Sequence, residues 1–247
     1  MISKTTRLAW GYGSMLVHGI THASLLRRPG VRASLVRQIH VTGVQALPYV
    51  SAVALVFGAF VVTEAFKLVG PDDDTVLKAL VWGGIRELGP LVTAFIIVVR
   101  SGVAIAAEVA LMRLRGAIKD SHWNDLAHEE EVVLPRVLGA AISAAALTVC
   151  FQFLAIAAAL AASALSQGTG LAFEFAAFAD TAPLHELPLS IGKAVLFGAG
   201  IAAISCYHGL KVESDVSELP KAVAAACVGC LSYVIAVDVV AIVLLFE

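Results

Sequence analysis

Charged residues are scarce in this sequence. They make up 15% of its 247 residues, whereas about a quarter of the residues are charged in a typical soluble domain. Hydrophobic residues make up 59%. This balance excludes an ordinary water-soluble domain, because much of the surface would carry too little charge to face water. The formal net charge is −2 and no segment forms a basic domain, so nothing indicates a nucleic-acid partner.

Catalytic and metal-binding motifs are also missing. The sequence contains no Walker A glycine-rich loop, no H-E-x-x-H and no G-x-S-x-G, and its seven histidines do not follow metal-ligand spacing. The one C-x-x-C pair, Cys227 and Cys230, is explained more simply by small buried residues on a membrane helix. We therefore expect this chain not to be an enzyme and to bind neither a metal nor a cofactor.

Long apolar runs are what the sequence has in abundance. A helix that spans a bilayer needs about 20 apolar residues, and five runs reach that length, at about 46–68, 76–112, 136–165, 189–209 and 221–246. The chain is predicted to be all-α, a single polytopic membrane domain over 1–247 with a five-helix transmembrane bundle over 46–247. The second run is too long for one straight span, and Pro90 is expected to kink or divide it.

Small residues recur within the predicted spans. Gly139, Ala140 and Ala144 lie in the third run, and Gly192, Gly198 and Ala202 lie in the fourth. Small side chains let membrane helices approach closely. This pattern favours a tightly packed bundle.

Residues 1–45 differ from the rest, because six Lys or Arg residues alternate with apolar ones. This mixture is typical of an amphipathic helix that lies in the membrane interface. A soluble helical cap is the alternative. We predict an N-terminal interfacial helical segment over 1–45, interrupted at Pro29–Gly30.

Lys and Arg residues fall in every second loop. They precede the first run, and they occur between the second and third runs and between the fourth and fifth, whereas the loops at 69–75 and 166–187 contain none. Because cytoplasmic loops carry an excess of Lys and Arg, the N-terminus is predicted to be cytoplasmic and the C-terminus to face outward. The segment 113–134 would then be a cytoplasmic loop.

Charges inside the apolar runs point to function, because each is costly in a membrane unless it is paired or hydrated. The positions that stand out are Glu64, Arg86, Glu87, Arg100, Glu108 and Asp238. Arg100 lies about four helical turns after Arg86, so the two are expected near the same helix face, and Glu108 lies too far along to pair with Arg100 within one helix. Their partners are therefore expected on other helices or another subunit. Arg100, Glu108 and Asp238 would serve structure or coupling.

The stretch Arg86-Glu87-Leu88-Gly89-Pro90 carries the most information. Pro90 has no N–H, so the carbonyl of Arg86 loses its helical partner and becomes available to another donor or to water. Gly89 leaves room for a neighbour or a ligand at the same level. Arg86 at such a bend could hold an anionic group. An Arg–Glu pair that only ties helices together is the competing interpretation.

The run from Arg86 to Met112 resembles the signature of the MlaE/YrbE permeases, the membrane subunits of ABC-type lipid transporters that work with MCE-domain proteins. The family pattern is R-E-L-G-P, then an Arg followed by Gly, then A-E and L-M. It is met here by Arg86, Glu87, Leu88, Gly89, Pro90, Arg100, Gly102, Ala107, Glu108, Leu111 and Met112. The resemblance extends over most of the chain through Arg37-Gln38, Gly43, Pro135-Arg136, Lys193, Phe197, Gly209 and Asp238.

The resemblance implies a non-catalytic permease subunit in the bacterial inner membrane that moves phospholipid or a related hydrophobic substrate. Its implied partners are a cytoplasmic ABC ATPase, which would bind the ATP and Mg, an MCE-domain lipid-binding protein, and a second permease copy or a divergent paralogue that completes a dimer. A pocket for membrane lipid would involve the stretch from Arg86 to Pro90 together with Glu64. Coupling to the ATPase would use residues of the 113–134 loop, namely Arg113, Arg115, Lys119, Asp120, Trp123, Asp125 and Glu129.

The chain departs from the family pattern within that loop, where Gly116-Ala117 and Ala127-His128 replace a Glu-Gln pair and an acidic-Pro step. Two interpretations follow: the chain pairs with a distinct ATPase, or it is the divergent half of a heterodimer. Two other functions also stay open. One is a secondary transporter or channel driven by an ion gradient through Glu64, Glu108 or Asp238. The other is a membrane scaffold with no transport role.

Overall fold

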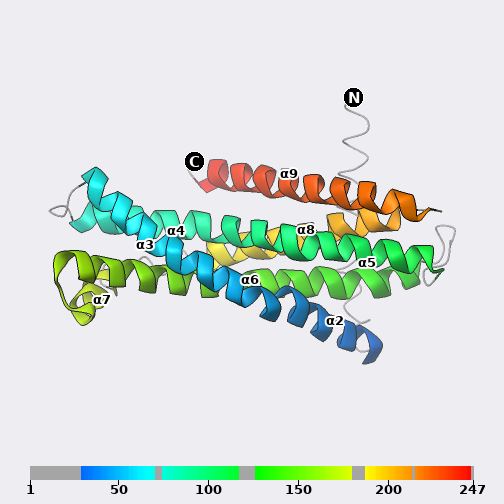
Figure 1. Ribbon diagram of the computed structural model, residues 1–247, viewed down its shortest axis with the longest axis horizontal. Coiled ribbons are helices and arrows are strands. Elements are labelled where there is room, and N and C mark those ends of the chain that lie inside the picture. The colour runs from blue at the N-terminus through cyan, green and yellow to red at the C-terminus, as the bar shows by residue number, and fades with distance from the viewer. Residues whose placement is uncertain (1–28, 70–73, 117–125, 180–186, 213–214, 246–247) are drawn as a thin grey trace.

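The computed structural model describes residues 29–69, 74–116, 126–179, 187–212 and 215–245 of the chain, and this part is helical throughout apart from its turns (Figure 1). In chain order the elements are α2 (Pro29–Thr42), the 3-10 turn η2 (Val44–Ala46), α3 (Leu47–Val69), α4 (Asp74–Ile97), the π turn η3 (Val98–Gly102), α5 (Val103–Leu114), α6 (Leu126–Gln167), α7 (Leu171–Ala179), α8 (Leu187–Leu210), the 3-10 turn η5 (Val216–Glu218) and α9 (Leu219–Leu245). The all-α prediction is confirmed.

Five helical stretches are long and apolar enough to cross a membrane. They are Gly30–Lys67, Ile85–Leu114, Val132–Gln167, Leu187–Leu210 and Val216–Val243. The prediction of a polytopic membrane protein with five spans is therefore confirmed. The chain also forms one helix that the apolar runs did not predict, because α7 lies within the expected loop at 166–187.

The long helices run roughly along one axis, and α2 and α3 cross the others at a slant (Figure 1). Helix α6 packs against α2, α3, α4 and α8, whereas α9 lies at one side against α8 and α5. The end of α3, the beginning of α4 and the whole of α7 lie at one end of the bundle. The beginning of α2 and the end of α5 lie at the other.

Glycine residues allow the closest approaches between helices. A Cβ atom on Gly198 of α8 would lie 2.5 Å from the carbonyl oxygen of Ala140 on α6, and one on Gly58 of α3 would lie 2.0 Å from that of Ala155. Because real Cβ atoms do not come so near to backbone, only glycine fits at these two contacts. The close packing expected from the small residues of the third and fourth runs is confirmed for α6 and α8.

The second predicted run contains an irregularity, but Pro90 does not divide it. Helix α4 continues through Pro90 to Ile97, and the hydrogen-bonding pattern changes only at the π turn Val98–Gly102. A π turn accommodates one extra residue and often marks a functional position in a helix. The irregular turn is therefore centred on Arg100.

Helix α2 begins at Pro29, where the sequence predicted an interruption, and residues 1–28 lie outside the described part. One face of α2 packs on α6 and buries Val31, Gln38 and Thr42, with a hydrogen bond of 2.7 Å from Gln38 Nε2 to Thr42 Oγ1. The opposite face exposes Arg32 and Val36. A location in the membrane interface stays a prediction for this segment.

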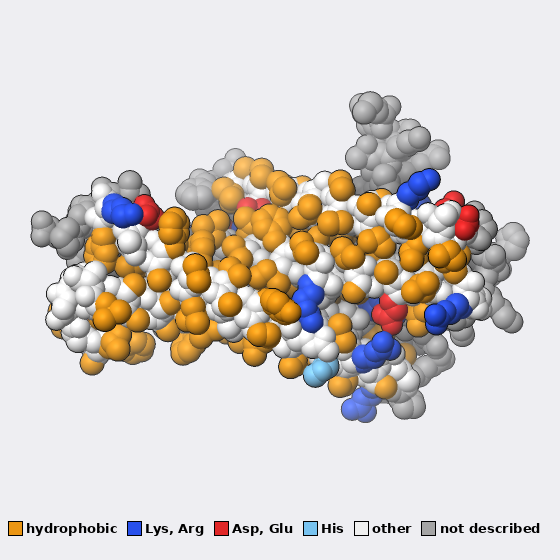
Figure 2. Space-filling model, in the orientation of Figure 1, with side chains coloured by type: hydrophobic (Ala, Val, Ile, Leu, Met, Phe, Trp, Pro, Cys, Tyr) orange, Lys and Arg blue, Asp and Glu red, His pale blue; other side chains and the backbone are white. Residues whose placement is uncertain are grey.

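Basic side chains gather at one end of the bundle, which we call the basic end, while the middle is mostly apolar (Figure 2). The described Lys and Arg residues near this end include Arg32, Arg37, Arg113, Arg115, Arg136, Lys211 and Lys221. We call the other end, where α7 lies, the α7 end. The assignment of the basic end to the cytoplasm stays a prediction from the charge pattern.

Candidate functional site

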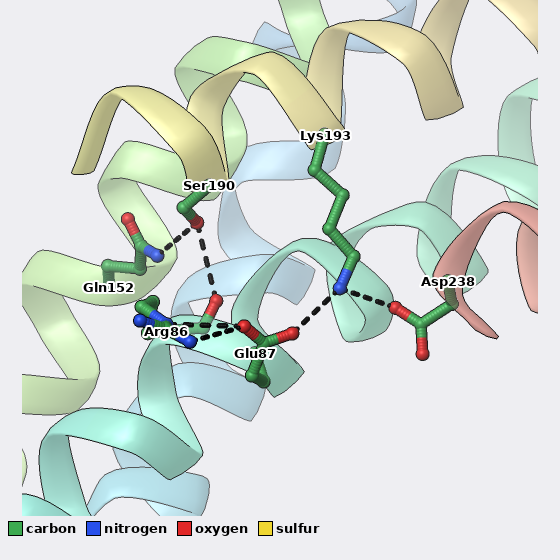
Figure 3. Close-up of polar contacts among 6 residues, drawn as sticks. All are labelled: Arg86, Glu87, Gln152, Ser190, Lys193 and Asp238. Atoms are coloured by element: carbon green, nitrogen blue, oxygen red, sulfur yellow. Dashed lines mark hydrogen bonds and ion pairs between the residues drawn. The ribbon is translucent and has the colours of Figure 1, made fainter. Parts of the chain in front are cut away.

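Four charged side chains from three helices meet inside the bundle (Figure 3). We call Arg86 and Glu87 of α4, Lys193 of α8 and Asp238 of α9 the charge cluster. Lys193 Nζ lies 2.9 Å from Glu87 Oε2 and 2.6 Å from Asp238 Oδ1. Arg86 Nη2 lies 2.9 Å from the other oxygen of Glu87. The cluster therefore ties α4, α8 and α9 together with two positive and two negative charges.

Burial differs across the cluster. The side chain of Lys193 is only 8% exposed, whereas those of Arg86 and Glu87 are 22% and 26% exposed. A buried charge that has lost its partners is strongly destabilising, and Lys193 has two carboxylates to offset its burial. Arg86 and Glu87 form the accessible edge of the cluster.

The cluster lies in the half of the bundle nearer the α7 end. Lys193 comes six residues after the start of α8, which is about 9 Å along the axis at 1.5 Å per residue. Arg86 comes twelve residues after the start of α4, which is about 18 Å along the axis at 1.5 Å per residue. If the basic end faces the cytoplasm, the charge cluster belongs to the outer half of the membrane.

Pro90 has the predicted effect on the carbonyl of Arg86. This carbonyl accepts a hydrogen bond of 3.3 Å from Ser190 Oγ of α8, in place of the missing helical N–H. Ser190 Oγ in turn accepts a bond of 2.6 Å from Gln152 Nε2 of α6. Figure 3 shows Gln152, Ser190 and Arg86 in this order beside the charge cluster. The freed carbonyl therefore joins α4 to α8 and, through Ser190, to α6.

Gly89 has a neighbour rather than an open space beside it. A Cβ atom here would lie 3.2 Å from Cγ of Gln152 and 3.4 Å from Cδ1 of Phe151. Gly89 and Pro90 are both buried, while Leu88 is exposed. Within the predicted pocket stretch, Gly89 thus serves helix packing, and Arg86, Glu87 and Leu88 reach the surface.

Glu64 does not join the charge cluster. Its Oε1 lies 2.7 Å from Nζ of Lys67, one turn further along α3, in an exposed ion pair. Glu64 lies five residues before the end of α3, and Arg86 lies twelve residues after the start of α4. The end of α3 and the start of α4 are adjacent (Figure 1). The seven-residue difference therefore separates Glu64 from Arg86 by roughly 10 Å along the bundle axis, at 1.5 Å per residue. Glu64 therefore belongs to a separate feature near the α7 end.

Arg100 and Glu108 have partners on other helices, as predicted. Arg100 donates to the carbonyl of Val41 at 2.8 Å and to Gln45 Oε1 at 3.0 Å, so it holds the π turn against the junction of α2 and α3. The Arg86 side chain forms an ion pair with Glu87 of the same helix. A position of Arg86 and Arg100 near one helix face stays a prediction from their spacing.

Glu108 of α5 lies between two arginines. Its carboxylate is 3.5 Å from Arg37 of α2 and 3.3 Å from Arg136 of α6. Asp238, grouped with these structural charges in the sequence analysis, instead lies in the charge cluster. Glu108 ties α5 to α2 and α6, and Asp238 ties α9 to α8 within the charge cluster.

The residues predicted to couple to an ATPase fall in three groups. Arg113 donates to the carbonyl of Leu210 at the end of α8, and Arg115 is exposed. Glu129 lies on α6, which begins at Leu126, so helices take up both ends of the segment predicted as a loop over 113–134. Lys119, Asp120, Trp123 and Asp125 lie outside the described residues.

The sequence did not predict three residues of this site as functional on their own, namely Lys193, Gln152 and Ser190. Lys193 is a charge in the fourth apolar run, but it was predicted only as part of the family resemblance. Gln152 and Ser190 are polar residues in apolar runs, which is a weak signal for hydrogen bonds between membrane helices. Among the residues that the structure describes, no three His, Cys, Asp or Glu side chains are placed to hold a metal ion.

Comparison with known proteins finds relatives over most of the chain. The family model described as Permease MlaE matches residues 35–244. The chain is 25% identical over 234 residues to a probable ABC transporter permease protein of Rickettsia conorii, a match that covers 91% of this chain and 88% of the relative. It is 31% identical over 133 residues to the intermembrane phospholipid transport system permease protein MlaE of Haemophilus influenzae, covering 52% of this chain and 51% of that protein.

Proposed function

The chain belongs to the MlaE permease family of ABC transporter permeases, and on this premise we propose that it moves phospholipid or a related hydrophobic substrate through a path beside the charge cluster. As a permease it is a multi-pass membrane protein and not itself the catalytic subunit. ATP hydrolysis would come from a separate ABC ATPase, which would bind the ATP and Mg. The Haemophilus relative is named for intermembrane phospholipid transport, which supports the substrate class.

The observation that carries the proposal is the accessible Arg86–Glu87 edge of the charge cluster. A guanidinium binds phosphate well, because its planar donors match the phosphate oxygens. If Arg86 turns to a headgroup phosphate, Glu87 keeps Lys193 as a partner at 2.9 Å. The cluster can therefore exchange one ion pair for a lipid contact without leaving a carboxylate unpaired in the membrane.

The proposed partners follow from the two ends of the bundle. An ATPase would bind at the basic end, through the segment 113–134, and an MCE-domain protein would receive or deliver lipid at the α7 end. A second copy of the chain, or a divergent paralogue, would complete the permease, and the location would be the bacterial inner membrane. The positive-inside pattern of the loops supports this orientation.

Removal of the Arg86 charge tests the proposal. The complete complex would be reconstituted in vesicles, and ATP-dependent transfer of a fluorescent phospholipid would be measured for wild type, Arg86→Gln and Arg86→Glu. Loss of a charged hydrogen bond should slow transfer about tenfold or more, and Arg86→Glu should abolish it while the complex still assembles. Arg32→Gln, an exposed arginine on α2, is the control. Transfer at the wild-type rate in Arg86→Glu would contradict the proposal.

The charge cluster also suits a transporter driven by an ion gradient, because carboxylates within a membrane can carry protons. The same vesicles distinguish the two. Transport that needs ATP and survives collapse of the proton and sodium gradients favours the permease function. Transport that follows a gradient without ATP favours the alternative, and a protein without bound lipid or transport would be a scaffold.

A further inference from the structure

A second polar feature lies near the α7 end, apart from the charge cluster. It is a cavity of about 290 Å³ between α3 and α6. Liquid water takes up about 30 Å³ per molecule, so this space corresponds to roughly ten waters, enough for a lipid headgroup but not for a whole lipid. The residues that line it are Val62, Thr63, Phe66 and Lys67 of α3 with Ala162 and Ser166 of α6.

One charged side chain, Lys67, lines the cavity, and a charge of opposite sign lies beside it. Lys67 lies 2.7 Å from the carboxylate of Glu64, and their side chains are 65% and 42% exposed. Both charges can thus reach a ligand from one helix turn. A ligand that satisfies both must itself carry an anion and a cation a short distance apart.

The two hydroxyl groups of the cavity are arranged as acceptors. Thr63 Oγ1 donates to the carbonyl of Ala59 at 2.7 Å, and Ser166 Oγ donates to that of Ser163 at 2.9 Å. Each hydroxyl has one proton and two lone pairs. Because the protons are used within their own helices, the oxygens are left to accept hydrogen bonds from a donor such as an ammonium group.

The neighbouring helix α7 indicates that this end of the bundle is surrounded by lipid. Glu174, the charged residue of α7, is buried against α6. It accepts hydrogen bonds from Ser163 Oγ at 3.0 Å and from Thr169 Oγ1 at 2.6 Å. Its large apolar residues Phe173 and Phe175 are 67% and 63% exposed. A helix in water would show the opposite arrangement. The cavity lies next to the ends of two spans, because Lys67 is two residues before the end of α3 and Ser166 is one residue before the end of α6. The ends of spanning helices are where a membrane has its headgroups.

The turn between α6 and α7 fixes this geometry. Gly168 has a φ of +69°, a backbone conformation that favours glycine. It reverses the chain directly after Ser166 and Gln167, and it brings Glu174 back onto Ser163. The same turn thus holds α7 against α6 and keeps Ser166 at the edge of the cavity.

We propose that this cavity binds the headgroup of a zwitterionic phospholipid with a primary ammonium, as in phosphatidylethanolamine. The phosphate contacts Lys67, and the ammonium contacts Glu64 with the hydroxyl oxygens as further acceptors. The first part of the acyl chains lies along Val62 and Phe66. Headgroup binding here stands independently of transport. Only its use as an entry or exit point for the transported lipid rests on the proposed function.

The test is lipid retention measured by native mass spectrometry. The full-length protein would be incorporated into nanodiscs with equal parts of phosphatidylethanolamine, phosphatidylcholine and phosphatidylglycerol of identical acyl chains, then released and the bound lipids counted. Wild type should retain phosphatidylethanolamine above the other two. Glu64→Gln should lose the preference over phosphatidylcholine, whose quaternary ammonium cannot donate. Lys67→Gln should lower retention of phosphatidylethanolamine by up to about fivefold, as expected for one exposed charge.

A second pair of variants tests the cavity without changing any charge. Ala162→Leu should fill the cavity and reduce retention, whereas Ala157→Leu, an exposed position on the same helix outside the cavity, should behave as wild type. Equal retention in wild type, Glu64→Gln and Lys67→Gln would overturn the proposal. So would binding of soluble phosphoethanolamine with no diacyl lipid retained.

Failure of this site and failure of the transport proposal give different results. If Arg86→Gln stops lipid transfer while the Glu64-dependent preference persists, both proposals stand. If the preference is absent in wild type while Arg86→Gln still stops transfer, only the headgroup site is overturned.

Discussion

The ammonium group of Lys193 lies 2.6 Å from the carboxylate of Asp238, and this ion pair joins α8 to α9 inside the membrane-spanning part of the chain. Helix α9 packs at the side of the bundle and exposes much of its apolar surface. A polar contact of this kind is strong where no water competes for it. The ion pair therefore helps to determine how α9 is held against the other spans.

We predict that Lys193→Met destabilises the protein by about 3 kcal/mol, because it leaves the carboxylate of Asp238 buried without a cation. Glu87 keeps Arg86 as a partner. Thermal unfolding in detergent would measure the loss. The double variant Lys193→Met with Asp238→Leu should recover much of the stability, since both charges are then gone. A single variant as stable as wild type would show that the ion pair contributes little.

Ser190→Ala is expected to cost about 1–2 kcal/mol of stability. The change removes the donor to the Arg86 carbonyl and the acceptor of Gln152, so two buried polar groups lose a partner. Ser190→Thr keeps the hydroxyl and serves as the matched variant. Loss of stability in Ser190→Ala, but not in Ser190→Thr, would confirm that the hydroxyl replaces the N–H that Pro90 lacks.

Two glycines on α8 provide a comparison of helix packing. A Cβ atom on Gly198 would lie 2.5 Å from backbone of α6, whereas one on Gly192 would meet nothing within 4 Å. Gly198→Ala should therefore destabilise the protein by about 1–3 kcal/mol through overpacking. Gly192→Ala should be neutral or stabilising by up to about 1 kcal/mol, because alanine is the better helix former. Similar melting temperatures for the two variants would contradict the close packing of α6 and α8.

The sequence was sufficient to predict the spans, because a bilayer imposes a minimum length on apolar helices, and it was also sufficient to predict that Pro90 frees the carbonyl of Arg86. It did not reveal that Ser190 is the donor. The spacing of residues along one helix predicts on which face of that helix each residue lies. It does not predict which other helix packs against that face. Lys193 shows the same difficulty: its charge was visible, but its pairing with Glu87 and Asp238 depends on how three helices associate.

The π turn at Val98–Gly102 had no signal in the apolar pattern. The grouping of Glu64 with Arg86 in one pocket came from the family resemblance. Glu64 and Arg86 lie at different levels because Glu64 is five residues from the end of α3, whereas Arg86 is twelve residues from the start of α4. Helix α7 was missed because its exposed phenylalanines and buried Glu174 are the reverse of the pattern expected for a helix in water.

The 3-10 turn before α9 should respond to pH. Asp215 accepts hydrogen bonds from the N–H and the hydroxyl of Ser217, and these bonds hold the pKa of its carboxyl below the usual range. A lowered pKa in the folded state gives stabilisation above the ordinary aspartate pKa, and this is lost as pH falls through the folded value. Hydrogen exchange at Ser217 should be faster in Asp215→Ala than in wild type at neutral pH, and this difference should vanish in acid. A difference that does not depend on pH would assign the protection to packing instead.

Charge reversal at the basic end tests where the proposed ATPase binds. Arg115 is exposed at the end of α5, within the segment proposed for coupling, and Lys221 is exposed at the start of α9, outside that segment. Arg115→Glu should reduce the amount of ATPase that co-purifies in mild detergent, by about tenfold if the arginine meets a carboxylate across the interface, because a favourable pair becomes a repulsive one. Lys221→Glu should leave co-purification unchanged, since it alters the charge of the same end without touching the segment. Equal losses in both variants would indicate that the ATPase responds to the overall charge of the basic end. No loss in Arg115→Glu would place the contact elsewhere on the chain.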